Sequence, residues 1–168
     1  MNKGFTLIEM VVAVTVFSLV VGVASGIFVS SLKAQRQSLA TQEVLDQISY
    51  VAEYMSRAIR MARKDMTGDC TGTPKLNYAF SGQCLKFRNY KNECQAFCLE
   101  GERLKNEAGV YLTSSSLKVE NFNVSLTGET QDDNLQPKVS IFLDIKGKEK
   151  SKIRIQTTIS QRNLDVCR

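Results

Sequence analysis

Five cysteines are the side chains of this sequence most capable of chemistry: Cys70, Cys84, Cys94, Cys98 and Cys167. The chain contains no histidine, so the commonest general base and the commonest metal ligand are both missing. The cysteine spacings contain no CxxC pair, which makes an all-thiolate zinc site the weaker interpretation. We therefore predict no catalytic residue, no metal and no other cofactor. Disulfide bonds are the expected state if the cysteines lie in an oxidising compartment.

The sequence does not select the disulfide pairing. Five choices of the unpaired cysteine, each with three pairings of the rest, leave fifteen arrangements. A hairpin would allow Cys84 to pair with Cys94 or with Cys98, and Cys70 could join a loop to the sheet. Cys167 is either the unpaired cysteine or forms a disulfide that fixes the C-terminal tail.

The compartment is indicated by the N-terminal segment. Residues Met10–Val29 carry no charge, and as a helix these twenty residues would span about 30 Å, the thickness of a bilayer core. Lys3 precedes this stretch, and Lys33 and Arg36 follow it. The positive start predicts that the N-terminus stays in the cytoplasm. An ordinary signal peptide, a simple anchor and a segment stored only temporarily in the membrane all remain compatible with this pattern.

Glu9 distinguishes among these possibilities, because it lies at the start of the apolar run. A carboxylate at the centre of a bilayer costs roughly 2.5–3.5 kcal/mol on insertion scales, and less near the edge. A plain signal peptide gains nothing from this cost. An acid in this position therefore needs a cationic partner, or it stabilises the start of a helix, where the macrodipole favours negative charge.

The segment Lys3-Gly4-Phe5-Thr6-Leu7-Ile8-Glu9, followed by the apolar helix, resembles the class III signal of type IV pilins and type II secretion pseudopilins. The resemblance implies that prepilin peptidase cleaves between Gly4 and Phe5 and methylates the new amine of Phe5. It also implies that Glu9 is the assembly residue, which would neutralise the amine of a neighbouring subunit. Phe5 and Glu9 are four residues apart, so a helix places them on one face.

Two glycines, Gly22 and Gly26, form a GxxxG pair inside the apolar stretch. Such a pair allows close helix–helix packing in a membrane, and we take it as a candidate packing site. It also weakens a helix, and glycine is common in membrane helices for no special reason. These alternatives stay open.

The helix is expected to continue beyond the membrane, because no proline or glycine interrupts residues 27–67. Steps of three and four residues separate a series of apolar side chains, which predicts an amphipathic helix ending near Lys64, with Gly68 as its stop. The predicted buried stripe consists of Leu45, Ile48, Ala52, Met55, Ile59 and Ala62, widened by Val51 and Ala58. The opposite face carries a Glu53–Arg57 pair and the basic side chains Arg57, Arg60, Arg63 and Lys64. A solvated surface is the simplest interpretation, and an acidic neighbour, a phospholipid or DNA are alternatives.

Short strands are predicted after Gly68. The candidates are 75–80, 84–90, 94–104 and 117–126, followed by a hairpin in which Val139, Ile141, Leu143 and Ile145 alternate, and then Ile153, Ile155, Thr157 and Ile159. Neither the apolar face of the helix nor that of the hairpin is buried by itself, so we expect the two faces to pack together. The fold class is therefore α+β: a long N-terminal helix, transmembrane in its first half and amphipathic in its second, packed on an antiparallel sheet as in pilins.

Two charged turns are candidates for ligand binding. Asp132-Asp133-Asn134 falls far short of a calcium-binding pattern and is interpreted as a solvated turn. Lys146, Lys148, Lys150 and Lys152 surround the last hairpin turn and are interpreted as a soluble, charged turn. Residues 65–168 carry fifteen basic and thirteen acidic side chains, a net +2, which does not favour a nucleic-acid-binding domain.

The expected organisation is a leader at 1–4, a transmembrane assembly helix at 5–32, its amphipathic continuation at 33–67, and a disulfide-bonded β-rich domain at 68–168. The resemblance implies a non-enzymatic minor pilin or pseudopilin precursor, anchored in the inner membrane and later part of an extracytoplasmic filament. Its expected partners are other pilin subunits, prepilin peptidase, the assembly platform and membrane lipid. The alternative is a secreted or anchored disulfide-rich binding module, for which Val23-Ala24-Ser25-Gly26 offers a weak ordinary cleavage site.

Overall fold

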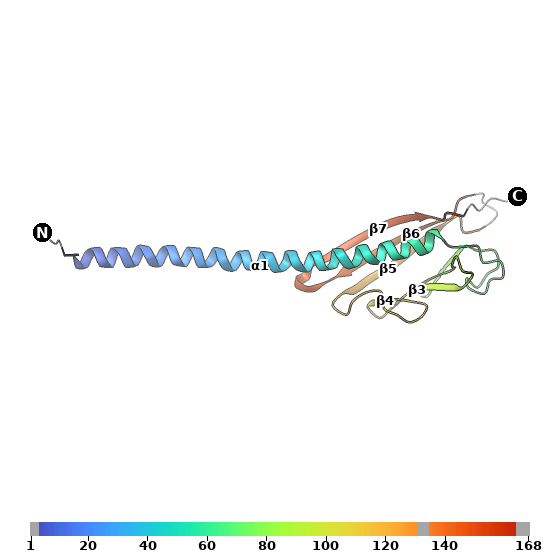
Figure 1. Ribbon diagram of the computed structural model, residues 1–168, viewed down its shortest axis with the longest axis horizontal. Helices are drawn as coiled ribbons and strands as arrows, with labels where there is room; N and C mark the ends of the chain where they lie inside the picture. The colour runs from blue at the N-terminus through green and yellow to red at the C-terminus, as the bar shows by residue number, and fades with distance from the viewer. Residues whose placement is uncertain (1–3, 131–134, 164–168) are drawn as a thin grey trace. The chain divides into compact units, whose positions relative to one another are not determined.

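The computed structural model describes residues 4–130 and 135–163. Within these residues the chain forms one long helix, then seven strands with a short 3-10 turn before the last of them. Figure 1 shows the long helix leading into the strands. The elements are α1 (Leu7–Arg60), β1 (Tyr78–Ser81), β2 (Cys84–Arg88), β3 (Cys94–Glu100), β4 (Arg103–Asn106), β5 (Lys118–Thr127), β6 (Lys138–Lys146), η1 (Lys148–Lys150) and β7 (Lys152–Ser160). The chain divides into two compact units, residues 1–39 and 40–168.

The first unit consists of the N-terminal part of α1. All of its described residues are exposed, and apolar side chains point in every direction around the helix. The hydroxyls of Thr15, Ser18 and Ser25 donate to the carbonyls of Val11, Val14 and Val21, at 2.8–2.9 Å. These bonds satisfy the polar groups inside the helix itself. By length and composition α1 is able to cross a membrane.

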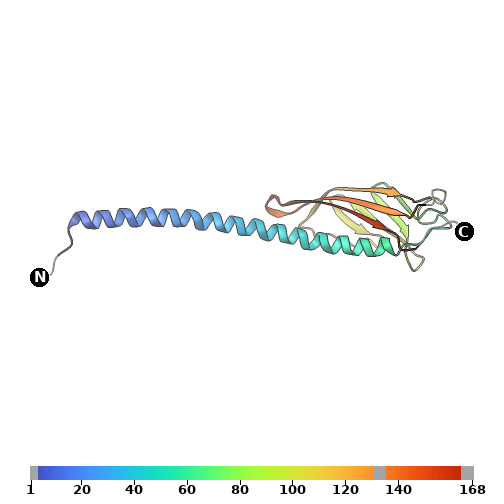
Figure 2. The ribbon, with the colours of Figure 1, turned by 90° about the horizontal axis from the view of Figure 1, so that it is seen from above.

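In the second unit the remainder of α1, from Ala40, packs on antiparallel sheets (Figure 2). One sheet has the order β1-β2-β3-β4 and the other the order β5-β6-β7. The predicted α+β class is therefore confirmed. The helix buries one stripe along this unit: Ala40, Val44, Ile48, Val51, Met55 and Ile59. The alternating residues of β6 and the large rings of β1–β3 face this stripe and complete the core.

Aromatic contacts join the helix to one sheet and the two sheets to each other. Tyr54 of α1 meets Phe97 of β3 edge to face, with ring centroids 5.9 Å apart. Phe80 of β1 meets Phe122 of β5 in the same way, at 5.8 Å. Gly147 lies at the turn after β6 so close to α1 that a side-chain Cβ there would overlap Val44. This turn therefore requires glycine.

Helix α1 ends at Arg60, before the predicted end near Lys64. The residues that follow form backbone hydrogen bonds to the sheet instead: Arg63 N–H donates to Arg88 O at 2.8 Å, and Asp65 N–H donates to Leu76 O at 2.9 Å. The helical periodicity continues to Ala62, which is fully buried, but these pairings end the helix. These hydrogen bonds to distant residues thus end the helix, although its apolar periodicity would allow another turn.

Candidate assembly site

The predicted processing segment lies at the start of the described chain. Gly4 has no neighbouring atom within 4 Å of the position where a Cβ would stand. Phe5 is 84% exposed. Helix α1 begins two residues later, at Leu7. A peptidase could therefore reach the Gly4–Phe5 bond without unfolding any packed structure, although cleavage there stays a prediction.

Thr6 and Glu9 form a reciprocal capping box at the start of α1. The backbone N–H and the hydroxyl of Thr6 both donate to Glu9 Oε2 at 2.9 Å. The backbone N–H of Glu9 points back to Thr6 Oγ1 at 3.4 Å. This arrangement satisfies orphan donors of the first turn and places a carboxylate at the positive end of the helix dipole. In the single chain, Glu9 therefore stabilises the helix N-terminus, the alternative considered beside its assembly role.

Glu9 is the only charged residue between Gly4 and Leu32, and it is exposed together with the apolar residues around it. A carboxylate in an apolar setting gains strongly from a cationic partner. The amine that cleavage would create on Phe5 lies one helical turn away in the sequence. Pairing of Glu9 with a neighbour's amine stays a prediction.

Gly22 and Gly26 lie four residues apart on one face of α1, and neither meets any atom within 4 Å of its missing Cβ. This surface is open to a second helix. Contact with one is a prediction that a single chain does not test.

Four cysteines form two disulfides, Cys70–Cys94 and Cys84–Cys98. Of the alternatives left open for Cys84, the structure has Cys98, its direct partner across β2 and β3. Cys94 instead bonds Cys70, in the loop after α1. Cys167 and Asp132-Asp133-Asn134 lie outside the described residues. Within residues 4–130 and 135–163, no cluster of His, Cys, Asp or Glu could hold a metal ion.

A buried carboxylate that the sequence analysis did not identify organises the loop after α1. Asp65 is fully buried and accepts hydrogen bonds from the backbone N–H groups of Gly68, Cys70 and Thr71 at 2.8–3.1 Å. Arg88 of β2 pairs with it at 2.9 Å. Burial alone would raise the pKa of Asp65, but these hydrogen bonds hold that pKa well below its usual range.

Several of the charged side chains predicted to be solvated form ion pairs. Arg57 Nε donates to Glu53 Oε1 at 2.6 Å, the expected i,i+4 pair. Around the last hairpin, Lys152 and Lys146 pair with Glu120, and Lys148 pairs with Glu43 of α1. The hydrogen bond from Lys152 lowers the pKa of Glu120. These pairs favour a charged, soluble turn over a ligand site.

The fold and the N-terminal segment define a class of protein: its first unit is an exposed apolar helix that begins with a capped segment, and its second unit has an α+β fold. Residues 1–25 match the model of the prokaryotic N-terminal methylation motif. The chain therefore carries the class III signal of type IV pilins, followed by a long apolar helix. No curated protein and no solved structure matches the chain.

The motif supports a type IV pilin or pseudopilin precursor that prepilin peptidase processes. Proteins of the pilin type are structural subunits, and they assemble with other pilin subunits. The motif and the apolar helix are consistent with membrane anchoring and a surface filament. The match covers residues 1–25 of 168 and does not extend to the second unit.

Proposed function

We propose that this chain is a minor pilin or pseudopilin precursor that becomes a structural subunit of a type IV pilus, a type II secretion pseudopilus or a DNA-uptake pseudopilus. The supporting observation is the methylation motif at residues 1–25, joined without a break to a helix whose first unit is apolar and exposed on every side. Such a surface is unstable in water and needs lipid or other helices around it.

In the proposed sequence of events, the helix first lies in the inner membrane with its N-terminus in the cytoplasm. Prepilin peptidase removes residues 1–4 and methylates Phe5. The assembly platform then transfers the subunit from lipid to a bundle of like helices, residues 5–32 serving as the assembly segment. Glu9 sets the axial register in that bundle by neutralising the N-terminal amine of a neighbour, and Gly22 and Gly26 lie where another helix approaches.

Residues 33–67 continue this segment into the disulfide-bonded domain, residues 68–168, which forms the outer surface of the filament in this proposal. The domain packs against α1 along the buried stripe between Ala40 and Ile59. It also holds the loop after the helix through the Cys70–Cys94 bond and the Asp65–Arg88 pair. A pulled helix therefore transmits force directly to the domain.

The experiment that tests the class is mass spectrometry of the mature N-terminus, in cells with and without prepilin peptidase. We expect an N-methylated Phe5 with the peptidase and the uncut precursor without it. A mature start near Gly26 that does not depend on that peptidase would instead indicate the secreted binding module. The amount of the chain in purified filaments, trace or abundant, distinguishes a minor from a major subunit.

A further inference from the structure

Strand β7 forms an open edge of the three-stranded sheet. The sheet has the order β5-β6-β7, so β7 pairs with β6 on one side, and no strand of the described residues pairs with its other side. The strand is nine residues long. In Figure 1 it lies on one side of α1, and β3 and β4 lie on the other side. The strand and the part of α1 from Ala40 onward belong to the second unit.

The ladder between β6 and β7 shows which backbone groups face the open edge. At one end Gly147 N–H donates to Ser151 O at 2.8 Å, and these two residues are therefore a hydrogen-bonded pair. At the other end Gln161 N–H donates to Pro137 O at 3.0 Å. Directly opposed residues of an antiparallel ladder alternate between bonded and non-bonded pairs, so every second residue of β7 turns its N–H and C=O groups outward. These residues are Lys152, Arg154, Gln156, Thr158 and Ser160.

Strand β7 lacks the features that usually protect an open edge from pairing. It contains no proline, and its register with β6 is unbroken, whereas β5 has a register shift. Its two charged side chains lie on the exposed face of the sheet, where both are paired: Arg154 with Asp144 at 3.2 Å, and Lys152 with Glu120. A long, regular edge of this kind is suited to pairing with another extended chain.

The inward side chains of β7 are less covered than those of its neighbour. The inward residues of β6 are all buried. On β7 only Ile159 is buried, while Ile153, Ile155 and Thr157 are half-buried. On α1, Leu45 is 45% exposed. The sheet therefore covers the helix incompletely beside β7.

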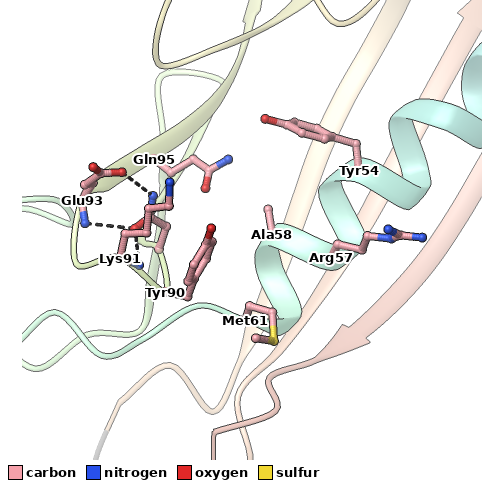
Figure 3. Close-up of a pocket in the computed structure, with 9 residues that line it drawn as sticks. Tyr54, Arg57, Ala58, Met61, Tyr90, Lys91, Glu93 and Gln95 are labelled. Atoms are coloured by element: carbon pink, nitrogen blue, oxygen red, sulfur yellow. Dashed lines mark hydrogen bonds between the residues drawn. The ribbon is translucent and has the colours of Figure 1, made fainter.

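Leu45 lies on the flank of α1 that turns toward β7. Glu43 and Gln47 hydrogen-bond to the segment between β4 and β5. Tyr54 lies on that same flank and lines a cavity with the turn between β2 and β3 (Figure 3). Leu45 is two positions from both Glu43 and Gln47, or about 200° around a helix, so it lies on the opposite flank. The half-buried Ala52 follows on this flank two turns later.

The occupant that fits this edge is an extended polypeptide segment with alternating apolar and polar side chains. Only an extended backbone offers N–H and C=O groups at the two-residue repeat of the β7 edge. A helix uses these groups internally, and nucleic acids and lipids have no such row. Apolar side chains on one face of the segment would cover Leu45 and Ile155. Polar side chains on its other face would continue the exposed face of β7.

A second copy of β7 fits this edge poorly. The strand runs in the same direction as α1, because Gly147 before it packs on Val44 and Gln161 after it bonds to Ala62 O. Antiparallel pairing of two β7 strands would point the two helices in opposite directions. Since α1 is able to cross a membrane, two chains inserted from the same side could not pair in this way. Parallel pairing about a two-fold axis would join the isoleucine face of one strand to the polar face of the other.

We propose that the open edge of β7, with the flank of α1 beside it, binds an extended segment of a partner protein as a fourth strand of the sheet. The apolar side chains of that segment face Leu45 and Ile155, and its backbone bonds to the outward groups of β7. The site is formed wholly by the second unit, so it does not depend on which filament the chain joins.

The test uses the full chain in a neutral detergent and labelled peptides, followed by fluorescence anisotropy. The first peptide, Thr-Val-Lys-Ile-Ser-Val-Glu-Ile-Thr, alternates polar and apolar residues. The second has the same residues with the four apolar ones placed together. The third is the first peptide with methylated backbone nitrogens, which keeps the side chains but removes the donors.

The decisive variant is Gln156→Pro, and Gln156→Ala is its matched control. Because the N–H of Gln156 points outward, proline removes an edge donor without breaking a bond to β6, whereas alanine keeps that donor. Leu45→Ala tests the flank of the helix independently. Circular dichroism verifies that each variant is folded, and sedimentation of the chain without peptide reports self-association.

We expect saturable binding of the first peptide, weakened about tenfold by Gln156→Pro and changed less than about twofold by Gln156→Ala. Leu45→Ala should weaken it about fivefold, and the second and third peptides should each bind about tenfold more weakly. Bound peptide should slow amide hydrogen exchange, followed by NMR, at the outward-facing residues of β7.

The proposal is overturned if the first peptide does not bind, or if Gln156→Pro and Gln156→Ala have equal effects. It is also overturned if exchange at the outward amides of β7 does not slow. If the chain alone dimerises and Gln156→Pro abolishes the dimer, β7 pairs with a second copy, and the assignment to a different partner is wrong.

Discussion

Asp65 illustrates at the scale of one residue how a buried charge can define a loop. Its carboxylate collects three backbone N–H groups from residues 68–71 and the guanidinium of Arg88. Nothing in the spacing of the sequence distinguishes Asp65 from its exposed neighbour Asp69. The difference arises from β2, which approaches from more than twenty residues away in the sequence and supplies Arg88. A partner so distant could not be identified from sequence.

Replacing Asp65 with asparagine should destabilise the second unit strongly. The change leaves Arg88 without its buried counter-charge, and breaking a buried ion pair costs about 3–5 kcal/mol. Asp69→Asn is the matched control, because Asp69 lies in the same loop and also approaches Arg88, at 3.4 Å, but is 71% exposed. Its loss should cost no more than about 1 kcal/mol. Thermal unfolding followed by circular dichroism measures both, and equal effects would contradict this account.

The same carboxylate predicts an acid-sensitive component of stability. The pKa of Asp65 in the folded chain lies well below its ordinary value of 3.8. The unfolded chain therefore takes up a proton first as the pH falls, so the stabilisation is complete above about pH 4 and is lost progressively below it. The difference in Tm between wild type and Asp65→Asn should shrink from about pH 6 to about pH 2. Glu120, whose pKa is also lowered, is present in both proteins and largely cancels. A difference that does not vary with pH would rule out this component.

Glu9 has two possible roles that can be separated by mutation. Glu9→Gln keeps a capping acceptor three residues after Thr6 but removes the charge. Thr6→Ala removes the side-chain part of the capping box but keeps the charge. If Glu9 neutralises a neighbour's amine, Glu9→Gln should reduce incorporation into filaments severely and Thr6→Ala only mildly, with both proteins still inserted in the membrane. The fraction of subunit in sheared filaments, compared with the membrane fraction, measures this. The reverse order of severity would assign Glu9 to helix capping alone.

At the scale of the elements, the C-terminal end of α1 is capped by the segment that follows β7. The carbonyl of Ala62 accepts from the side chains of Gln161 and Asn163 at 3.1 and 3.0 Å. The backbone N–H of Arg162 donates to Arg60 O at 2.8 Å. These bonds satisfy carbonyls that a helix end leaves without partners. The segment after β7 thus helps to hold the helix end that the pairings of Arg63 and Asp65 define.

The double substitution Gln161→Ala and Asn163→Ala should loosen this helix end. Each hydrogen bond contributes about 0.5–1.5 kcal/mol. The two substitutions remove both side-chain donors from the carbonyl of Ala62, a buried residue. We expect faster amide hydrogen exchange in the last turns of α1 and a lower Tm. Arg162→Ala is the control, because the Arg162 contact to the helix uses its backbone. Unchanged exchange at residues 55–62 would refute the capping role.

The predicted elements agree with the structure where a repeating pattern carries the signal. The final hairpin is β6 and β7, and the single predicted strand 94–104 is instead two strands, β3 and β4, which turn at Gly101. The predicted stripe is correct at Ile48, Met55 and Ile59 of α1, and at Ala62, which is buried just after the helix ends. It is wrong at Leu45, which is 45% exposed, while Val44 is fully buried. The turn at Gly147 packs on Val44, so Val44 and not Leu45 lies in the buried stripe. The helical period of the sequence alone does not predict this contact.

At the scale of the whole molecule, one disulfide joins the loop after α1 to the sheet, and a second joins β2 to β3. Cys70–Cys94 closes a separation of 24 residues and Cys84–Cys98 one of 14. Chain-entropy models give each such bond about 2–4 kcal/mol, and the longer loop about 0.5 kcal/mol more. The first bond also holds the end of the turn that joins β2 to β3. The N-terminal signal, by contrast, could be identified entirely from sequence, because the short segment Lys3–Glu9 and the apolar run contain all of its features.

The pairing itself can be tested by peptide mapping without reduction. Phe97 lies between Cys94 and Cys98, so digestion with trypsin and then chymotrypsin separates these two cysteines. We expect one linked pair that joins the Cys70 and Cys94 peptides and another that joins the Cys84 and Cys98 peptides. Cys70→Ser with Cys94→Ser should lower the free energy of unfolding by about 2–4 kcal/mol. Cys84→Ser with Cys98→Ser should cost a similar but slightly smaller free energy, because this bond closes the shorter loop. A Cys84–Cys94 link would contradict both expectations.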